Sequence, residues 1–161
     1  MELLIKEARI VDYYHDFIGD IYIADGIINK IGVNLNERCL KIDGEGLVVM
    51  PSFVDLHVHF REPGFTRKED IESGSRAAVK GGYTMVNLMA NTNPVCSSMD
   101  IVDYVLNRAR QLGLIDVHQC VSITDNFGGK DISHLDKLDN RVKIISEDGK
   151  DVADSSVMLE A

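Results

Sequence analysis

The sequence predicts an α/β fold, namely about the first four βα units of a partial (β/α)8 TIM-type barrel preceded by a small N-terminal β module. Three observations lead to this prediction. After residue 51, apolar strand-like segments alternate with helical segments, and such alternation is typical of a parallel sheet with right-handed crossovers. Polar residues follow each of these strands, as they do at the mouth of a barrel. Residues 1–50 contain only short strands and turns, so the predicted domains are 1–50 and 51–161.

The β module is predicted from short apolar runs separated by turn residues. Asp25-Gly26 lies between two such runs, at 20–24 and 27–31, and this dipeptide is a strong indicator of a hairpin. Further strands are expected at 3–5, 8–11, 40–44 and 47–50, and Pro51 ends the module.

The barrel region is expected to begin with a strand at 53–60. This segment is apolar on both faces, which is typical of a parallel strand covered on both sides. Thr66 and Glu69 have the spacing of a capping box, so a helix is predicted to start there and to end at Gly81-Gly82. The later strands are expected at 83–89, 115–124 and 142–146. The later helices are expected from Ser97 or Ser98 to Gly113, at 132–138 and at 154–161.

An open doubly wound sheet is the alternative architecture. It is disfavoured because the first βα loop lacks the glycine fingerprint of a nucleotide-binding crossover.

The composition excludes several classes of function. A net charge of −9 argues against nonspecific nucleic-acid binding. No apolar run is long enough to span a bilayer, and the first residues do not form a signal peptide. The three cysteines are widely spaced, which suits a reducing compartment better than a disulfide framework. We therefore expect a cytoplasmic protein that binds neither nucleic acid nor membrane.

Candidate site residues gather at the ends of the predicted strands. His57 and His59 are two residues apart, so on a strand their side chains point the same way and form a half-site for a divalent metal such as zinc. Asp148 follows the fourth predicted strand and adds a carboxylate. Arg61 could hold an acid group through a bidentate pair, and Asn91 could orient the same group. The residues predict metal-assisted hydrolysis of an amide whose substrate carries an acid group.

Each of these residues also has a simpler explanation. A single histidine in a strand is more often a core or rim residue than a ligand. Arg61 could pair with Glu62 or Glu69 at the surface. The segments at 91–94 and 148–149 could be plain turns, because asparagine, aspartate, glycine and proline favour turns.

The run FVDLHVHFREPG at 53–64 resembles the signature of dihydroorotases, in the cyclic amidohydrolase branch of the amidohydrolase superfamily. The segments at 91–94 and 147–149 are also similar to that family, and the resemblance covers the whole chain. It implies the reversible cyclisation of N-carbamoyl-L-aspartate to L-dihydroorotate in de novo pyrimidine biosynthesis. Three residues depart from the family pattern, in which Gly, Pro and Asp are usual: Ser52, Ala90 and Glu147.

The resemblance implies a role for each candidate residue. His57, His59 and Asp148 would bind one or two zinc ions, with Asp148 able to bridge two. Arg61 and Asn91 would bind the carboxylate of a small anionic substrate. The other two metal-binding histidines and the general-base aspartate belong to later barrel units in this family. We therefore expect no catalytic residue within 1–161, and we expect the chain to be a truncated portion that is poorly stable or self-associating alone.

The expected partners are further copies of the chain in a homo-oligomer and aspartate carbamoyltransferase. Two other functions stay open. One is a different cyclic amidohydrolase, such as a hydantoinase, dihydropyrimidinase or allantoinase; Arg61 and Asp148 favour dihydroorotase, because hydantoinases use a carboxylated lysine at the place of Asp148. The other is an inactive dihydroorotase-like subunit that supports a carbamoyltransferase. The intact pair of His57 and His59 argues against it.

Overall fold

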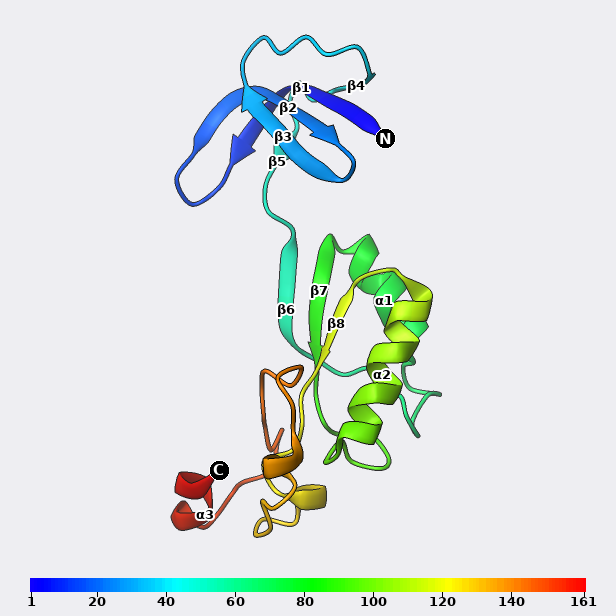
Figure 1. Cartoon of the computed structure of the whole chain (residues 1–161), viewed down its shortest axis with the longest axis vertical. Helices are drawn as coiled ribbons and strands as arrows, with labels where there is room; N and C mark the ends of the chain where they lie inside the picture. The colour runs from blue at the N-terminus through cyan, green and yellow to red at the C-terminus, as the bar shows by residue number, and fades with distance from the viewer. The chain divides into compact units, whose positions relative to one another are not determined.

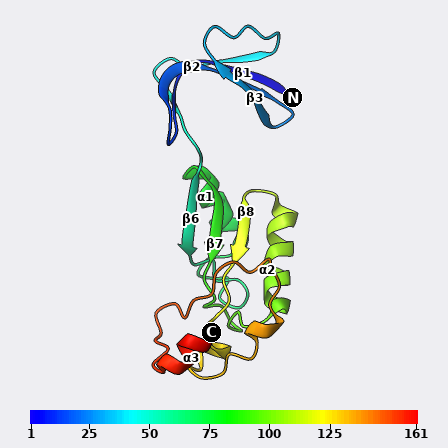
Figure 2. The same ribbon diagram turned by 60° about the vertical axis from the view of Figure 1, so that its left-hand side comes forward.

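The structure is a computed structural model that describes all residues from 1 to 161. The chain divides into two compact units, Met1–Pro51 and Ser52–Ala161, and Figures 1 and 2 show their elements. None of the helices has both the length and the apolar character needed to cross a membrane.

The first unit is a five-stranded sheet with the main order β3-β2-β1-β4, and β5 also pairs with β1. β1 and β2 are antiparallel, as are β2 and β3, whereas β4 and β5 run parallel to β1. Asp25 and Gly26 both have positive φ between β2 and β3, so the predicted hairpin is confirmed. The strand bounds are β1 Glu2–Val11, β2 Asp16–Ala24, β3 Ile27–Gly32, β4 Leu40–Asp43 and β5 Val48–Val49.

A bulge in β1 corrects the prediction of separate strands at 3–5 and 8–11. The two runs form one strand whose register shifts between Ile5 and Ala8, where Glu7 has a φ of 58°. The buried carboxylate of Asp20 accepts hydrogen bonds from the backbone N–H of Glu7 at 2.9 Å and from Lys6 Nζ at 2.7 Å. A buried acid therefore holds the irregular backbone of the bulge.

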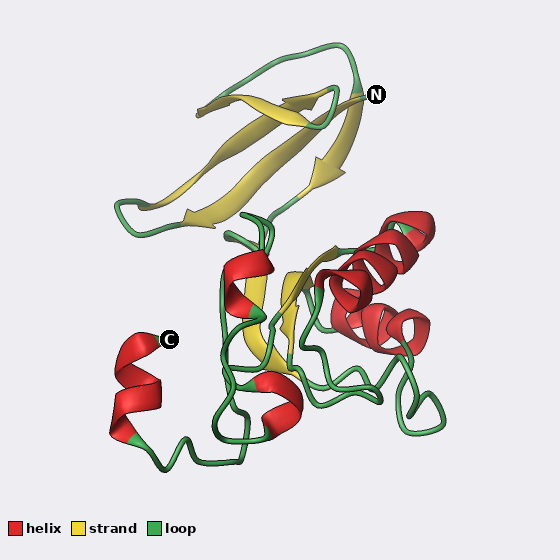
Figure 3. Cartoon of the chain, turned by 60° about the horizontal axis from the view of Figure 1, so that its bottom comes forward, coloured by secondary structure: helices red, strands yellow, loops and turns green.

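The second unit contains a parallel sheet with the order β6-β7-β8. Its strands are β6 Phe53–Val58, β7 Tyr83–Leu88 and β8 Asp116–Gln119; the helices α1 Ile71–Lys80 and α2 Met99–Leu112 connect them. α1 packs on β7 and on α2, and α2 packs on β8. Both helices cover the same face of the sheet (Figure 3), as right-handed crossovers require.

The core of this unit lies between the sheet and the two helices. One cluster consists of Phe60, Ile71, Val86, Leu88, Val105, Ala109 and Val117. A second cluster consists of Ala90, Cys96, Val102, Leu106 and Val121, which follow β7 or β8 or belong to α2 and the segment before it. Phe60 packs so closely on α1 that a Cβ at Gly74 would lie 2.2 Å from its ring. Only glycine fits at position 74, and this packing fixes the chain just after β6.

The prediction that the strand at 53–60 is buried on both faces is wrong. β6 ends at Val58, and Leu56 is 61% exposed, with Phe53 and Val54 also exposed. The reason is that β6 is an edge strand that pairs only with β7. In addition, α1 packs on β7 and α2 packs on β8, so the apolar side chains of β6 are left largely uncovered.

The predicted start of the first helix is also corrected. α1 begins at Ile71, and its capping box joins Asp70 to Ser73 instead of Thr66 to Glu69. The second helix agrees with its prediction, since α2 has Ser98 as its N-cap and ends at Gly113 in the left-handed conformation. The later elements are shorter than predicted: β8 ends at Gln119, and the segment 132–138 contains only a 3-10 turn, η2 Leu135–Lys137.

The predicted strand at 142–146 does not form. Its place is taken by a single parallel bridge between Val121 and Ile145, which follows the end of β8. The remaining elements are the 3-10 turn η1 Asp125–Phe127 and the short helix α3 Ser155–Glu160.

Candidate metal centre

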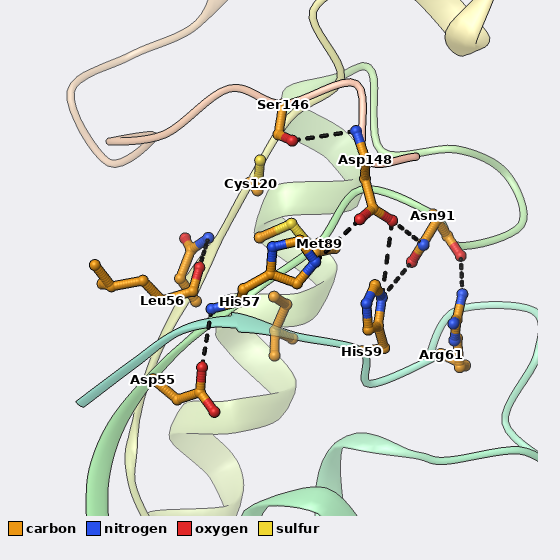
Figure 4. A network of polar contacts seen from close by, with 12 residues as sticks. Asp55, Leu56, His57, His59, Arg61, Met89, Asn91, Cys120, Ser146 and Asp148 are labelled. Atoms are coloured by element: carbon orange, nitrogen blue, oxygen red, sulfur yellow. Dashed lines mark hydrogen bonds and ion pairs between the residues drawn. The ribbon is translucent and has the colours of Figure 1, made fainter. Parts of the chain in front are cut away.

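The paired histidines lie at the carboxyl end of β6. His57 belongs to the strand and His59 follows it directly, so the alternation of the extended backbone directs both side chains to the same side (Figure 4). Their ring centroids are 5.0 Å apart, with an interplanar angle of 69°. Phe60, which packs on α1, anchors the backbone immediately beyond them.

Asp148 completes a group of three possible metal ligands. Its Oδ1 lies 3.1 Å from His57 Nε2, and its Oδ2 lies 3.8 Å from His59 Nδ1. One ligand atom from each residue falls within 4.8 Å of the others. Two atoms bound to one tetrahedral zinc ion at ordinary bond lengths lie about 3.3 Å apart. The donor set of two imidazoles and a carboxylate, gathered within this distance, suits zinc.

The loop that carries Asp148 has an irregular backbone. Asp148 has a φ of 35°, a left-handed conformation that costs a non-glycine residue on the order of 1–2 kcal/mol. Its N–H donates to Ser146 Oγ at 3.1 Å. The segment before it is hydrogen-bonded to the chain beyond β8, through Ser146 N–H to the carbonyl of Val121 at 3.0 Å.

Asn91 joins Asp148 to His59. The side-chain amide of Asn91 donates to Asp148 Oδ2, and its Oδ1 lies 3.1 Å from His59 Nδ1. Because an amide oxygen only accepts, this contact places the proton of His59 on Nδ1. The Nε2 lone pair of His59 is then free to bind a metal ion.

Arg61 lies beside Asn91, as Figure 4 shows. Its Nη1 donates to the backbone carbonyl of Asn91 at 3.4 Å. The guanidinium forms no ion pair with Glu62 or Glu69 within 4.0 Å. Glu62 accepts a hydrogen bond from the N–H of Ile71, and Glu69 accepts one from the hydroxyl of Ser73. A positive charge without an acidic partner next to an amide suits the recognition of an anionic group.

The cysteines near the site are neutral thiols. Burial raises the pKa of Cys120 to about 12, with a further contribution from the charge of Asp148. Burial likewise raises the pKa of Cys96 to about 12, with Cys120 contributing. Neither residue supplies a thiolate at neutral pH.

The structure thus brings together all five candidates found in the sequence: His57, His59, Arg61, Asn91 and Asp148. Sequence reasoning missed two buried glutamates next to them. Glu62 accepts from the N–H of Ile71 at 2.9 Å and from the hydroxyl of Tyr104 at 2.5 Å. Glu147 accepts hydrogen bonds from the backbone N–H and the hydroxyl of Thr124. The sequence points to Glu62 only as a possible surface partner of Arg61 and to Glu147 only as a departure from the family pattern.

The parallel sheet with helices on one face, together with paired histidines and an aspartate near the strand ends, is the arrangement that the sequence led us to expect of the amidohydrolase class. A family model described as dihydro-orotase-like matches residues 46–161. The chain belongs to this family, and the resemblance found in the sequence is confirmed.

Two curated relatives illustrate the similarity. The dihydroorotase of Clostridium botulinum is 54% identical over 164 residues, which cover 100% of this chain and 41% of the relative. The dihydroorotase of Ruminiclostridium cellulolyticum is 41% identical over 165 residues, which cover 100% of this chain and 39% of the relative. The chain therefore spans about two fifths of the length of these relatives.

Solved structures with the same fold include two hydantoinases. The L-hydantoinase of Arthrobacter aurescens has a TM-score of 0.70 and 23% identity, over 89% of this chain and 35% of that protein. A D-hydantoinase has a TM-score of 0.60 and 29% identity, over 77% of this chain and 28% of that protein. These similarities confirm the predicted fold class, a partial (β/α)8 barrel.

Proposed function

We propose that this chain supplies the first metal-binding part of a zinc-dependent dihydroorotase. The reaction is the reversible cyclisation of N-carbamoyl-L-aspartate to L-dihydroorotate in pyrimidine biosynthesis. The observation that carries the proposal is the meeting of His57, His59 and Asp148 beside the unpaired guanidinium of Arg61. The identity to curated dihydroorotases supports it.

His57, His59 and Asp148 hold one or two zinc ions in this proposal. When bound, zinc polarises a carbonyl group and lowers the pKa of water. Asn91 keeps the proton of His59 on Nδ1 and so leaves Nε2 available. The carboxylate of Asp148 is directed at both imidazoles by the amide of Asn91.

Arg61 and Asn91 bind the acid group of the substrate. The guanidinium offers several donors in one plane, which matches a carboxylate in a bidentate pair. Binding this group fixes the amide of the substrate relative to the metal ligands, and such positioning is itself a large part of catalysis. The two further histidines and the general-base aspartate of the family belong, in this proposal, to the part of the relatives that the chain does not match.

The site also fits a hydantoinase-type reaction on other cyclic amides, because the solved structures with this fold include hydantoinases. We favour dihydroorotase because an aspartate stands where the resemblance expects the carboxylated lysine of hydantoinases. We also propose a cytoplasmic location, a homo-oligomer and association with aspartate carbamoyltransferase. The three free cysteines support a reducing compartment.

The test joins this chain to the residues of the Clostridium botulinum relative that follow its matched region. The fusion is assayed with dihydroorotate, hydantoin and dihydrouracil, and its zinc content is measured on the same fractions. We expect turnover of dihydroorotate well above that of the two other rings. Turnover of hydantoin or dihydrouracil without dihydroorotate would contradict the proposal, as would a fusion that folds and holds zinc but turns over none of the three.

A further inference from the structure

A buried glutamate stands directly before the candidate ligand Asp148. Glu147 is only 5% exposed, and no Lys, Arg or His lies within ion-pair distance of its carboxylate. Both of its oxygens instead accept hydrogen bonds from one residue, Thr124, which is completely buried. A buried carboxylate needs such donors, and here they all fasten one loop to another.

The two contacts with Thr124 form a clamp. Glu147 Oε2 accepts from the backbone N–H of Thr124 at 3.0 Å, and Oε1 accepts from the Thr124 hydroxyl. The hydroxyl oxygen in turn accepts from the N–H of Gly129 at 2.8 Å. A carboxylate that accepts two hydrogen bonds from one residue fixes both the distance and the orientation of the loop that carries it.

Backbone hydrogen bonds give this loop little other support just before Asp148. The segment at 144–146 is joined to Val121 by two backbone hydrogen bonds, the last of which is that of the Ser146 N–H. Beyond Ser146 the ladder stops, and the side chain of Glu147 makes the next connection to the chain beyond β8. The following residue, Asp148, has a φ of 35°, and a residue in that conformation persists only when its surroundings determine it.

We infer that Glu147 is a positioning residue for the metal site, which holds Asp148 over His57 and His59 by clamping its loop to Thr124. The inference rests on the metal site proposed above and deepens it. Asp148 Oδ1 lies 3.1 Å from His57 Nε2, and a shift of the loop by about 1 Å is enough to spoil a metal geometry of this kind. Without the clamp, the left-handed backbone at Asp148 relaxes and its carboxylate leaves the histidines.

The test is a cobalt(II) titration of the metal-free chain, followed by visible absorption and by competition with a chromophoric chelator. Glu147→Ala is expected to weaken cobalt binding by about 10–100-fold, the range typical of residues that orient metal ligands. The absorption bands of the bound cobalt are expected to change as well, because one ligand is displaced. Thr124→Val should weaken binding in the same direction by a smaller factor, whereas Thr124→Ser, which keeps the hydroxyl, should restore it.

Glu62→Ala is the matched control. Glu62 is also buried, at 7% exposure, and it accepts from one backbone N–H and one hydroxyl, but it is not connected to the Asp148 loop. Its replacement removes the same number of atoms and should leave cobalt affinity and spectrum unchanged. Circular dichroism identifies the variants that fold. If Glu147→Ala does not fold, Thr124→Val tests the role of Glu147 in its place.

The outcomes separate this inference from the proposed function. If the parent chain binds cobalt in a way that His57→Ala abolishes, and the clamp variants bind it equally well, the role of Glu147 is overturned and the metal site stands. An equal loss in Glu62→Ala would also overturn it, because the effect would then reflect general loosening. If the parent shows no His57-dependent cobalt binding, both the metal site and the inference fail.

Discussion

The two halves of the candidate metal site are built on different kinds of backbone. His57 lies on strand β6, whose register with β7 shifts between Asp55 and Val58, and its side chain is 59% exposed. Asp148 lies on a loop with a left-handed φ, and its side chain is 8% exposed. The strand directs its side chains through its own alternation. The loop needs polar contacts from other parts of the chain, which Asn91 supplies to Asp148 and Thr124 supplies to Glu147. Within the loop, Ser146 Oγ accepts from the N–H of Asp148.

The comparison shows that irregular backbone in this chain depends on hydrogen bonds to buried carboxylates. Irregular backbone in this chain is held by buried acids in three places: Asp20 at the bulge of β1, Glu62 between Arg61 and α1, and Glu147 at the Asp148 loop. At the strand end, the half-buried Asp55 accepts a hydrogen bond from the His57 N–H at 3.0 Å. The backbone beyond His59 depends instead on apolar packing of Phe60 against α1. The two halves should therefore fail in different ways.

Replacing both histidines at the end of β6 is expected to have the largest effect on zinc binding. His57→Ala combined with His59→Ala should abolish zinc binding, because one carboxylate cannot hold zinc alone. The measurement is zinc content by mass spectrometry after size fractionation. His15→Ala, in the first unit, is the control and should keep the metal. Full zinc content in the double variant would contradict the assignment of both ligands.

Neutralising Asp148 is expected to have the second largest effect on zinc binding. Asp148→Asn keeps the shape of the side chain but removes the charge, and we expect zinc affinity to fall by more than the roughly 10–100-fold typical of residues that only orient a ligand. Competition with a chelator measures this loss. The thermal stability of the metal-free variant should change little in comparison. A variant with unchanged zinc affinity would show that Asp148 is not a ligand.

Packing at the strand end is tested by Gly74→Ala. The new Cβ would lie 2.2 Å from the ring of Phe60, and forcing extra volume into a packed core typically costs about 1–3 kcal/mol. Urea unfolding measures this loss, and the displaced Phe60 should weaken metal binding as well. Gly32→Ala is the control, because its Cβ would meet nothing closer than 3.7 Å. Equal stability of both variants would show that Phe60 does not support the strand end.

The smallest expected effect concerns the support of Glu62. Tyr104→Phe removes the hydroxyl that donates to Glu62 at 2.5 Å, and such a loss typically costs about 1 kcal/mol. Zinc affinity should not change, because Glu62 does not touch the Asp148 loop. Urea unfolding and zinc competition check the two statements separately. A loss of zinc affinity would mean that the two halves are coupled through Glu62.

Tyr104 also predicts a dependence on pH. Its hydrogen bond to Glu62, together with burial, raises the pKa of Tyr104 above its ordinary value. The folded state then holds this proton more tightly than the unfolded state, so the stabilisation is complete below about pH 10 and is lost as the pH rises through the folded pKa. The Tyr104→Phe variant should lack this part of the alkaline loss. An identical alkaline profile in parent and variant would contradict it.

Several features were predictable because neighbouring residues alone determine them. The hairpin at Asp25-Gly26 needs two residues that accept positive φ. The bounds of α2 follow from Ser98 and Gly113. The shared direction of His57 and His59 follows from the two-residue period of an extended backbone.

The tertiary structure alone decided the rest, because those features depend on residues far apart in the chain. The strand predicted at 142–146 reduces to one bridge. The side chains of β6 are exposed because β6 lies at the edge of the sheet, and no local pattern specifies which strand becomes the edge. Asp148 meets His57 across 91 residues only because its loop is bonded to the chain beyond β8. Local preferences specify backbone direction over a few residues, whereas the position of a loop is set by long-range hydrogen bonds that no local pattern records.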